Sequence, residues 1–187
     1  MHCPVCQNGR PLAPETLEEH LTAWHCTECS GHWIRLADYW RWRAQARVES
    51  RGTPEALESV APAPDSDTDT FGIKRCPDCQ YVLGRFIVGR NVPFAIDRCR
   101  NCNGAWLDRD EWATLKRRNL HDDLHLIFSD EWQKEARLEE QRRVAEARLR
   151  RKFGSGDYAR VREVKGWLDG HPKRSELLAF IIQTGTR

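Results

Sequence analysis

The chain has 187 residues, of which 40% are hydrophobic and 31% are charged, and its net charge is +2. This composition is typical of a soluble, ordered protein and has neither a membrane nor a fully disordered bias. The longest apolar run, "LLAFII" from Leu177, is far shorter than the roughly 20 residues that span a bilayer, so we expect no membrane partner.

The N-terminal segment "MHCPVC" lacks the basic and apolar regions of a secretory signal. We therefore expect a cytoplasmic protein, and thiols stay reduced in that compartment. The 8 cysteines are consequently predicted to be metal ligands rather than disulfide partners.

One cysteine pattern occurs twice, at an offset of 73 residues: "CPVCQ" and "CTECSGHW" in the first copy, "CPDCQ" and "CRNCNGAW" in the second. In each copy 19 residues separate the two Cys-x-x-Cys pairs. Two such pairs joined by a hairpin direct four sulfurs at one tetrahedral ion, and zinc suits this site with Zn–S bonds of about 2.3 Å. We predict two structural Zn²⁺ ions, held by Cys3, Cys6, Cys26 and Cys29 and by Cys76, Cys79, Cys99 and Cys102.

Each copy is small enough, at roughly 45 residues, to need a metal for stability. Gly31 and Gly104 are expected to form tight turns after the second cysteine pair, and Trp33 and Trp106 are expected to fill the two small cores. An iron ion in the same sulfur geometry remains an alternative. Thiol–disulfide exchange is disfavoured, because that chemistry uses one Cys-x-x-Cys motif in a βαβ context.

Three histidines lie beside the cysteines in the sequence: His2, His25 and His32. Each could replace a thiol ligand. Since four cysteines are already present in each copy, we expect these side chains at the surface or next to the ligands instead.

The segment "DYWRWRAQAR" follows the first copy and alternates aromatic and arginine residues, as a base-stacking surface would. We favour an amphipathic helix with Tyr39 and Trp42 facing inward. Residues 53–70 then contain five acidic residues and no basic ones, and their Pro, Ala and Ser content predicts a flexible linker.

In the second copy, "FIVGRNVPFAI" predicts a hairpin in which Val92, Phe94 and Ile96 share one face. Asp108 is predicted to cap a helix, with Glu111 at the capping-box position. We expect a long charged helix over residues 129–152 with acid–base pairs such as Glu139–Arg143, then a helix capped by Asp157 and a third with Pro172 in its first turn.

Residues 76–112 resemble the bacterial and archaeal zinc ribbons grouped as transcription factor IIB-like zinc fingers, which carry a CPxC pair, a hairpin ending near "IDRC" and a CxxC-x-G-x-W-L-D segment. The first copy departs from this pattern, with Glu19 in place of Val92 and Arg35 in place of Asp108. We interpret it as a degenerate ribbon with a weaker apolar core. The resemblance implies contact with nucleic acid or with the transcription machinery.

The predicted fold class is a small metal-stabilised α+β protein: two tandem zinc ribbons, each a short β-hairpin with a following helix, and a C-terminal all-α segment. The expected divisions are residues 1–48 for the degenerate ribbon, 49–72 for the linker, 73–120 for the second ribbon and 121–187 for the helical region.

The second ribbon is basic, with ten basic and five acidic residues over positions 71–118. We predict a zinc-ribbon adaptor that binds DNA or RNA, with contacts from Arg85, Arg90, Arg98 and Arg100. The alternative is a protein–protein module without a nucleic-acid role, whose C-terminal helices bind a protein partner or a second copy. We expect no enzymatic activity and no small-molecule substrate, because protein ligands fill all four positions at each metal.

Overall fold

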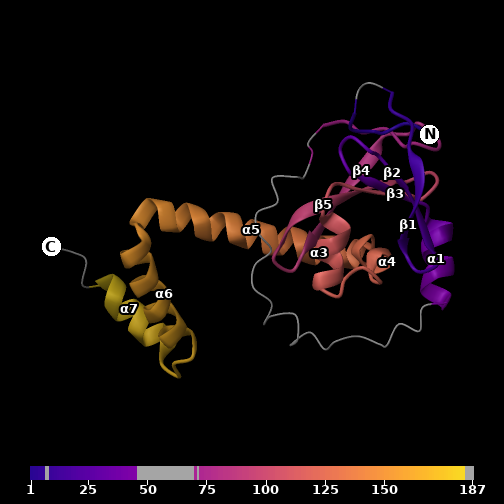
Figure 1. Ribbon diagram of the computed structural model, residues 1–187. Coiled ribbons are helices and arrows are strands. Elements are labelled where there is room, and N and C mark those ends of the chain that lie inside the picture. Colours follow the sequence, from indigo (N-terminus) through magenta and orange to yellow (C-terminus); the bar gives the residue numbers. More distant parts are fainter. Residues whose placement is uncertain (7–8, 46–69, 71, 184–187) are drawn as a thin grey trace. The chain divides into compact units, whose positions relative to one another are not determined.

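The computed structural model describes residues 1–6, 9–45, 70 and 72–183, which fall into two compact units divided after Glu139 (Figure 1). The first unit is an antiparallel sheet with helices and two four-cysteine clusters, and the second unit is helical. These features confirm the predicted fold class. The expected linker at 49–72 lies mostly outside the described residues, so its boundaries stay a prediction.

Within the described residues, six strands of the first unit form one sheet in the order β1-β2-β3-β6-β5-β4. The first ribbon supplies β1 (Ala13–Glu18), β2 (Leu21–His25) and β3 (His32–Ile34). The second ribbon supplies β4 (Leu83–Gly89), β5 (Val92–Cys99) and β6 (Ala105–Leu107). Because β3 and β6 are adjacent, the two ribbons share one continuous sheet.

The junction between the ribbons is nearly symmetric. In the antiparallel pairing of β3 with β6, Trp33 lies opposite Trp106. These two residues occupy the same position in the two sequence repeats. Equivalent surfaces therefore meet each other, as they do across the two-fold axis of a homodimer.

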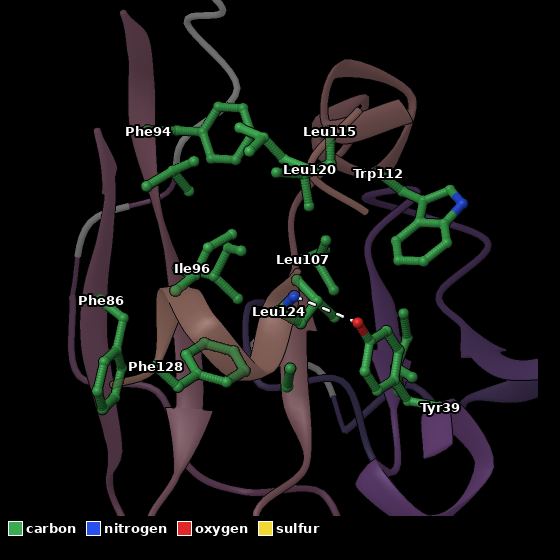
Figure 2. Packing of buried hydrophobic residues seen from close by; sticks show 14 of the residues in the cluster. Tyr39, Phe86, Phe94, Ile96, Leu107, Trp112, Leu115, Leu120, Leu124 and Phe128 are labelled. Carbon is green, nitrogen blue, oxygen red and sulfur yellow. Dashed lines mark hydrogen bonds between the residues drawn. The ribbon is translucent and has the colours of Figure 1, made fainter. Parts of the chain in front are cut away.

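Helices cover one face of this sheet: α1 (Leu36–Gln45), α3 (Glu111–Arg117), α4 (Leu124–Ile127) and the start of α5 (Asp130–Phe153). Figure 2 shows the apolar core beneath them, which draws side chains from both ribbons. The Tyr39 hydroxyl in α1 accepts a hydrogen bond of 3.3 Å from the backbone N–H of Leu124 in α4. One core therefore stabilises both ribbons.

Two sequence predictions about this core are confirmed. Val92, Phe94 and Ile96 are all buried in it, as their alternation predicts. Tyr39 and Trp42 of α1 also lie inside the core, so the aromatic positions of "DYWRWRAQAR" include two packing residues.

The turn between β4 and β5 is held by the start of α5. Gly89, Arg90 and Asn91 all have positive φ, at 70°, 52° and 59°. Their backbone is fixed by Glu139, whose carboxylate accepts hydrogen bonds from the N–H groups of Arg90 at 2.8 Å and Asn91 at 3.4 Å. Glu139 thus connects α5 to the hairpin, a contact that its predicted pairing with Arg143 did not anticipate.

The second unit contains the rest of α5 together with α6 (Ser155–Asp169) and α7 (Arg174–Gln183). The three helices agree with prediction, but two of their starts do not. Gly154, with φ of 80°, is the N-terminal cap of α6, so Asp157 lies inside the first turn. Pro172 precedes α7 because that helix begins at Arg174. No helix of the described residues combines the length and apolar character needed to cross a membrane.

Candidate metal centres and the interface between the ribbons

The eight cysteines form two compact clusters, which lie apart from the hydrophobic core beneath the helices. In cluster 1 the Sγ–Sγ distances are 3.6 Å for Cys3–Cys29 and 3.8 Å for Cys6–Cys26. In cluster 2 both corresponding distances, for Cys76–Cys102 and Cys79–Cys99, are 3.4 Å. A tetrahedron with Zn–S bonds of about 2.3 Å has edges of about 3.8 Å.

All four sulfurs of each cluster lie within 4.8 Å of one another, and all eight cysteines are free thiols. The two clusters therefore fit two structural zinc sites. Bound zinc would stabilise the fold of each ribbon, because one ion would hold its two Cys-x-x-Cys pairs together.

The electrostatic environment differs among the thiols. The backbone N–H of Tyr81, assisted by the side chain of Asn101, lowers the pKa of Cys79 to about 6. Burial raises the pKa of Cys29 to about 11. Cys79 is therefore deprotonated readily, whereas Cys29 loses its proton more easily when a cation is present to compensate the buried charge.

The turns after the second cysteine pairs have a shared backbone geometry. The N–H groups of Cys26 and Cys99 donate to the carbonyl groups of Gly31 and Gly104, both at 2.9 Å. The left-handed residues in these turns are Ser30 and Asn103, with φ of 59° and 62°. Gly31 and Gly104 therefore lie in the predicted turns but do not have a positive φ, so they are required for another reason.

That reason is the tryptophan of the opposite ribbon. A Cβ atom on Gly31 would lie 2.2 Å from Cζ2 of Trp106, and one on Gly104 would lie 2.1 Å from Cζ2 of Trp33. Both indoles are fully buried. Each tryptophan therefore packs across the glycine of the other ribbon, and the two tryptophan–glycine pairs interlock the ribbons.

An ion pair crosses the same interface. Arg35 of the first ribbon donates from Nε and Nη2 to both carboxylate oxygens of Asp78, at 3.0 and 2.8 Å. The indole N–H of Trp33 donates to Asp78 as well, at 3.0 Å. The Arg35 guanidinium holds the pKa of the Asp78 carboxyl below its ordinary value.

This pair explains why the first copy departs from the family pattern at Arg35. In the repeat, Arg35 corresponds to Asp108, and Asp78 corresponds to Val5. The opposite charges are thus divided between the two ribbons. Sequence reasoning missed the pair, although the charge changes at positions 35 and 78 were a visible signal.

Asp108 has a different role from the predicted helix cap. Helix α3 begins at Glu111, and the residue before it, Asp110, has left-handed φ of 65° and no side-chain cap. The Asp108 carboxylate accepts hydrogen bonds from the Trp106 indole at 2.7 Å and from Lys74 at 3.0 Å. One half of the predicted capping box is present, because Glu111 accepts from the Asp108 N–H at 2.8 Å.

Lys74 is the centre of a buried ionic group with Asp97 and Asp108, all three less than a tenth exposed. Burial alone would lower the pKa of the Lys74 ammonium, but its hydrogen bond to Asp97 and the charges of both carboxylates outweigh burial and raise it. The ammonium therefore stays charged and fixes the carboxylate that orients Trp106.

The four arginines predicted to contact nucleic acid do not share one surface. Arg85 lies opposite Asp97 in the β4–β5 register, whereas Arg98 lies opposite Gly84. Since side chains alternate along a strand, Arg85 and Arg98 project from opposite faces of the sheet.

Their contacts differ as well. Arg98 is partly buried, donates to the Asn103 side chain at 2.7 Å and lies 4.8 Å from the Phe128 ring. Arg90 is exposed and lies 3.9 Å above the Trp132 ring. Arg85 and Arg100 are exposed. Nucleic-acid contact by these residues stays a prediction.

The histidines next to the cysteines are separate from both clusters. His25 and His32 stack on each other with ring centroids 5.0 Å apart, and both approach Glu15. His2 is exposed and forms an isolated β-bridge with Pro11. No motif or spacing in the sequence predicts that Glu15 contacts these rings.

The fold and the clusters define a zinc-binding protein with two zinc ribbons. The family described as transcription factor zinc-finger matches residues 2–45, and the second four-cysteine cluster fits a second ribbon of the same kind. The family model thus matches the first copy, although its residues depart further from the zinc-ribbon pattern than those of the second. The first copy nevertheless retains the hairpin, the third strand and the four-cysteine cluster. No curated protein and no solved structure matches the chain significantly.

Proposed function

We propose that this protein is a non-enzymatic zinc-ribbon adaptor that binds nucleic acid, and that the helical unit of residues 140–187 supplies many of the phosphate contacts. The observation that carries the proposal is a separation of charge. Residues 140–187 contain twelve Lys and Arg against six Asp and Glu, whereas residues 1–139 contain eighteen against twenty-two. Positive charge concentrated in one unit of the chain favours binding to a phosphate backbone.

The basic unit has a hollow of about 560 Å³ where α5 meets α6. Arg143, Arg150 and Arg151 line it together with Tyr158, and the Arg150 guanidinium lies 5.5 Å from the Tyr158 ring. One guanidinium group can donate hydrogen bonds to two phosphate oxygens at once, and a tyrosine ring can stack on a base. The hollow therefore combines the two chemistries that bind a single-stranded nucleic acid.

The ribbons support the same role in two ways. Arg85 and Arg100 are exposed on the second ribbon and add positive charge. The first ribbon matches a family whose description names transcription factors, which supports a nucleic-acid role by analogy. The role is non-enzymatic because four protein thiols at each cluster leave no position for a substrate.

The test is a titration of the zinc-loaded protein against labelled single-stranded RNA, single-stranded DNA and duplex DNA at several salt concentrations. We expect micromolar or tighter binding whose logarithm falls linearly with the logarithm of salt concentration. A variant with Arg143, Arg150 and Arg151 changed to Gln should lose affinity and reduce the magnitude of the salt slope by roughly 2 to 3.

The matched control changes Arg160, Arg162 and Lys165 to Gln, because these exposed residues of α6 carry the same charge but lie outside the hollow. A smaller loss in this control supports a specific site, and equal losses indicate a diffuse charge effect. A parallel variant with Arg85 and Arg100 changed to Gln measures the contribution of the second ribbon. Absence of binding to all three probes at physiological salt would contradict the proposal.

A second candidate function is a protein-interaction module, favoured by apolar side chains on the surface of α6 and α7. Trp167 is 56% exposed, Phe180 65% and Ile182 75%. Large apolar side chains exposed on two helices are candidates for contact with a protein partner. If the nucleic-acid titration is negative, sedimentation velocity over a range of concentrations tests self-association, and Trp167→Ala and Ile182→Ala should weaken it.

A further inference from the structure

Three potential metal ligands converge on one face of the first ribbon and belong to neither cysteine cluster. Glu15 lies in β1, His25 in β2 and His32 in β3. His25 is directly opposite His32 in the β2–β3 register, and Glu15 is opposite Ala23, two residues from His25. Because side chains two apart share a face, all three project from the same side of the sheet.

Their ligand atoms point at a common place. Oε2 of Glu15 lies 3.1 Å from Nε2 of His32 and 3.7 Å from Nδ1 of His25. The three ligand atoms are all within 4.8 Å of one another. Around a tetrahedral zinc ion with bonds of about 2.1 Å, neighbouring ligand atoms are about 3.4 Å apart. The two distances to Glu15 bracket that value, so the ion requires only small side-chain adjustments.

The site is ordered but accessible. The His25 and His32 rings are stacked and their side chains are 26% and 17% exposed, whereas the Glu15 side chain is 46% exposed. The histidine pair is therefore held in place, and an ion can enter from the side of the carboxylate.

The internal repeat shows that these residues are not needed to build a ribbon. Positions 15, 25 and 32 of the first ribbon correspond to Val88, Arg98 and Ala105 of the second. None of these three binds a metal, yet the second ribbon has the same strands and the same four-cysteine cluster. The ligand set is an addition to the first ribbon alone.

We propose that Glu15, His25 and His32 bind a third divalent transition-metal ion, with Zn²⁺ as the species best suited to the geometry. Two histidines and one carboxylate leave a fourth coordination position for water or an added ligand, unlike the closed four-thiolate clusters. The third ion is consequently expected to exchange more readily than the two structural ions. This inference does not depend on nucleic-acid binding.

The experiment starts from the full chain with both cysteine clusters loaded with zinc. Native mass spectrometry and equilibrium dialysis count the zinc ions bound as free Zn²⁺ is raised, and nitrogen-detected NMR follows the imidazoles. We expect a third equivalent, accompanied by chemical-shift changes at Nδ1 of His25 and Nε2 of His32. Saturation at two equivalents, or a third equivalent without these shifts, would overturn the proposal.

Three single substitutions, Glu15→Gln, His25→Gln and His32→Gln, test the ligands one at a time. Each should weaken the third site at least about tenfold while the two structural ions are retained. Glu15→Gln is the mildest for the fold, since its side chain is the most exposed of the three.

The matched control is His20→Gln. His20 lies in the turn of the same hairpin and approaches Glu19 at 3.5 Å, but it belongs to no group of three ligands among the described residues. Its substitution should leave the third site unchanged. Retention of the third equivalent in all three ligand variants, or an equal loss in the His20 variant, would contradict the assignment.

Discussion

At the scale of single residues, Gly31 and Gly104 have to be glycines because each packs against the indole ring of the opposite ribbon. Neither glycine has a positive φ, and the left-handed positions beside them are filled by Ser30 and Asn103. A side chain at either glycine would overlap a fully buried ring. The glycine and tryptophan of each repeat are therefore matched to their counterparts across the interface rather than to each other.

We predict that Gly31→Ala and Gly104→Ala each destabilise the first unit by about 1–3 kcal/mol, because the Cβ atom has to displace a packed ring. Urea unfolding of the zinc-loaded protein, followed by tryptophan fluorescence, measures the change. Gly84→Ala is the control in the same sheet, since its Cβ would meet its nearest neighbours at 3.4 and 3.5 Å. Equal stability of Gly31→Ala and wild type would exclude the interlock.

At the scale of elements, the start of α5 closes the outer edge of the sheet. The Gln133 side chain, 3% exposed, accepts from the N–H of Ile87 at 3.1 Å and donates to its carbonyl at 2.8 Å. Its amide also donates to the Ile127 carbonyl at 2.7 Å. The side-chain amide thus forms the hydrogen bonds that a neighbouring strand would form with β4. It satisfies the backbone N–H and carbonyl of Ile87, which would otherwise be available to pair with another chain.

Gln133→Leu keeps the size of the side chain but removes these hydrogen bonds, so we expect a loss of at least about 2 kcal/mol in stability. Hydrogen exchange at the Ile87 amide should accelerate more than exchange at amides in the centre of the sheet. The exposed Gln141 lies on the same helix, and Gln141→Leu serves as the control. Unaltered exchange at Ile87 would show that α5 does not protect this edge.

At the scale of the whole molecule, the two ribbons of residues 1–139 behave as one body. They share a sheet and a core, and Glu18 of the first ribbon accepts hydrogen bonds from Trp112 at 3.0 Å and Lys116 at 2.5 Å in the second. We therefore expect the interface to couple the stability of one zinc site to that of the other.

Cys99→Ser should remove the second zinc and also lower the resistance of the first zinc to a chelator, because the first ribbon loses its folded partner. Zinc release followed by mass spectrometry, together with NMR spectra of the first ribbon, measures the coupling. Cys26→Ser is the reciprocal variant and should weaken the second site. Wild-type resistance at the remaining cluster in both variants would mean that the ribbons fold independently.

The helices α6 and α7 belong to the second unit, which contains neither cysteine cluster. Their NMR signals should persist in both cysteine variants, which separates loss of the ribbons from general unfolding. This outcome would also allow the nucleic-acid contribution of residues 140–187 to be measured after the ribbons have lost their zinc.

The sequence by itself determined the metal ligands, the hairpin face of Val92, Phe94 and Ile96, and the inward side of α1. These features depend on local spacing: the Cys-x-x-Cys turn, the two-residue period of a strand and the helical period each fix geometry within a few residues. The long charged helix was predictable for the same reason.

Only the tertiary structure decided how the two repeats meet. Strand β3 pairs with β6, and Arg35 forms an ion pair with Asp78, so both contacts join segments that are distant in the sequence. The Asp108 carboxylate had several possible partners, and in the structure it accepts hydrogen bonds from Lys74 and Trp106. Local pattern does not specify which surfaces of two similar modules will be buried together. That choice depends on the shape fit of indole on glycine and on charges that complement each other only after the ribbons have docked.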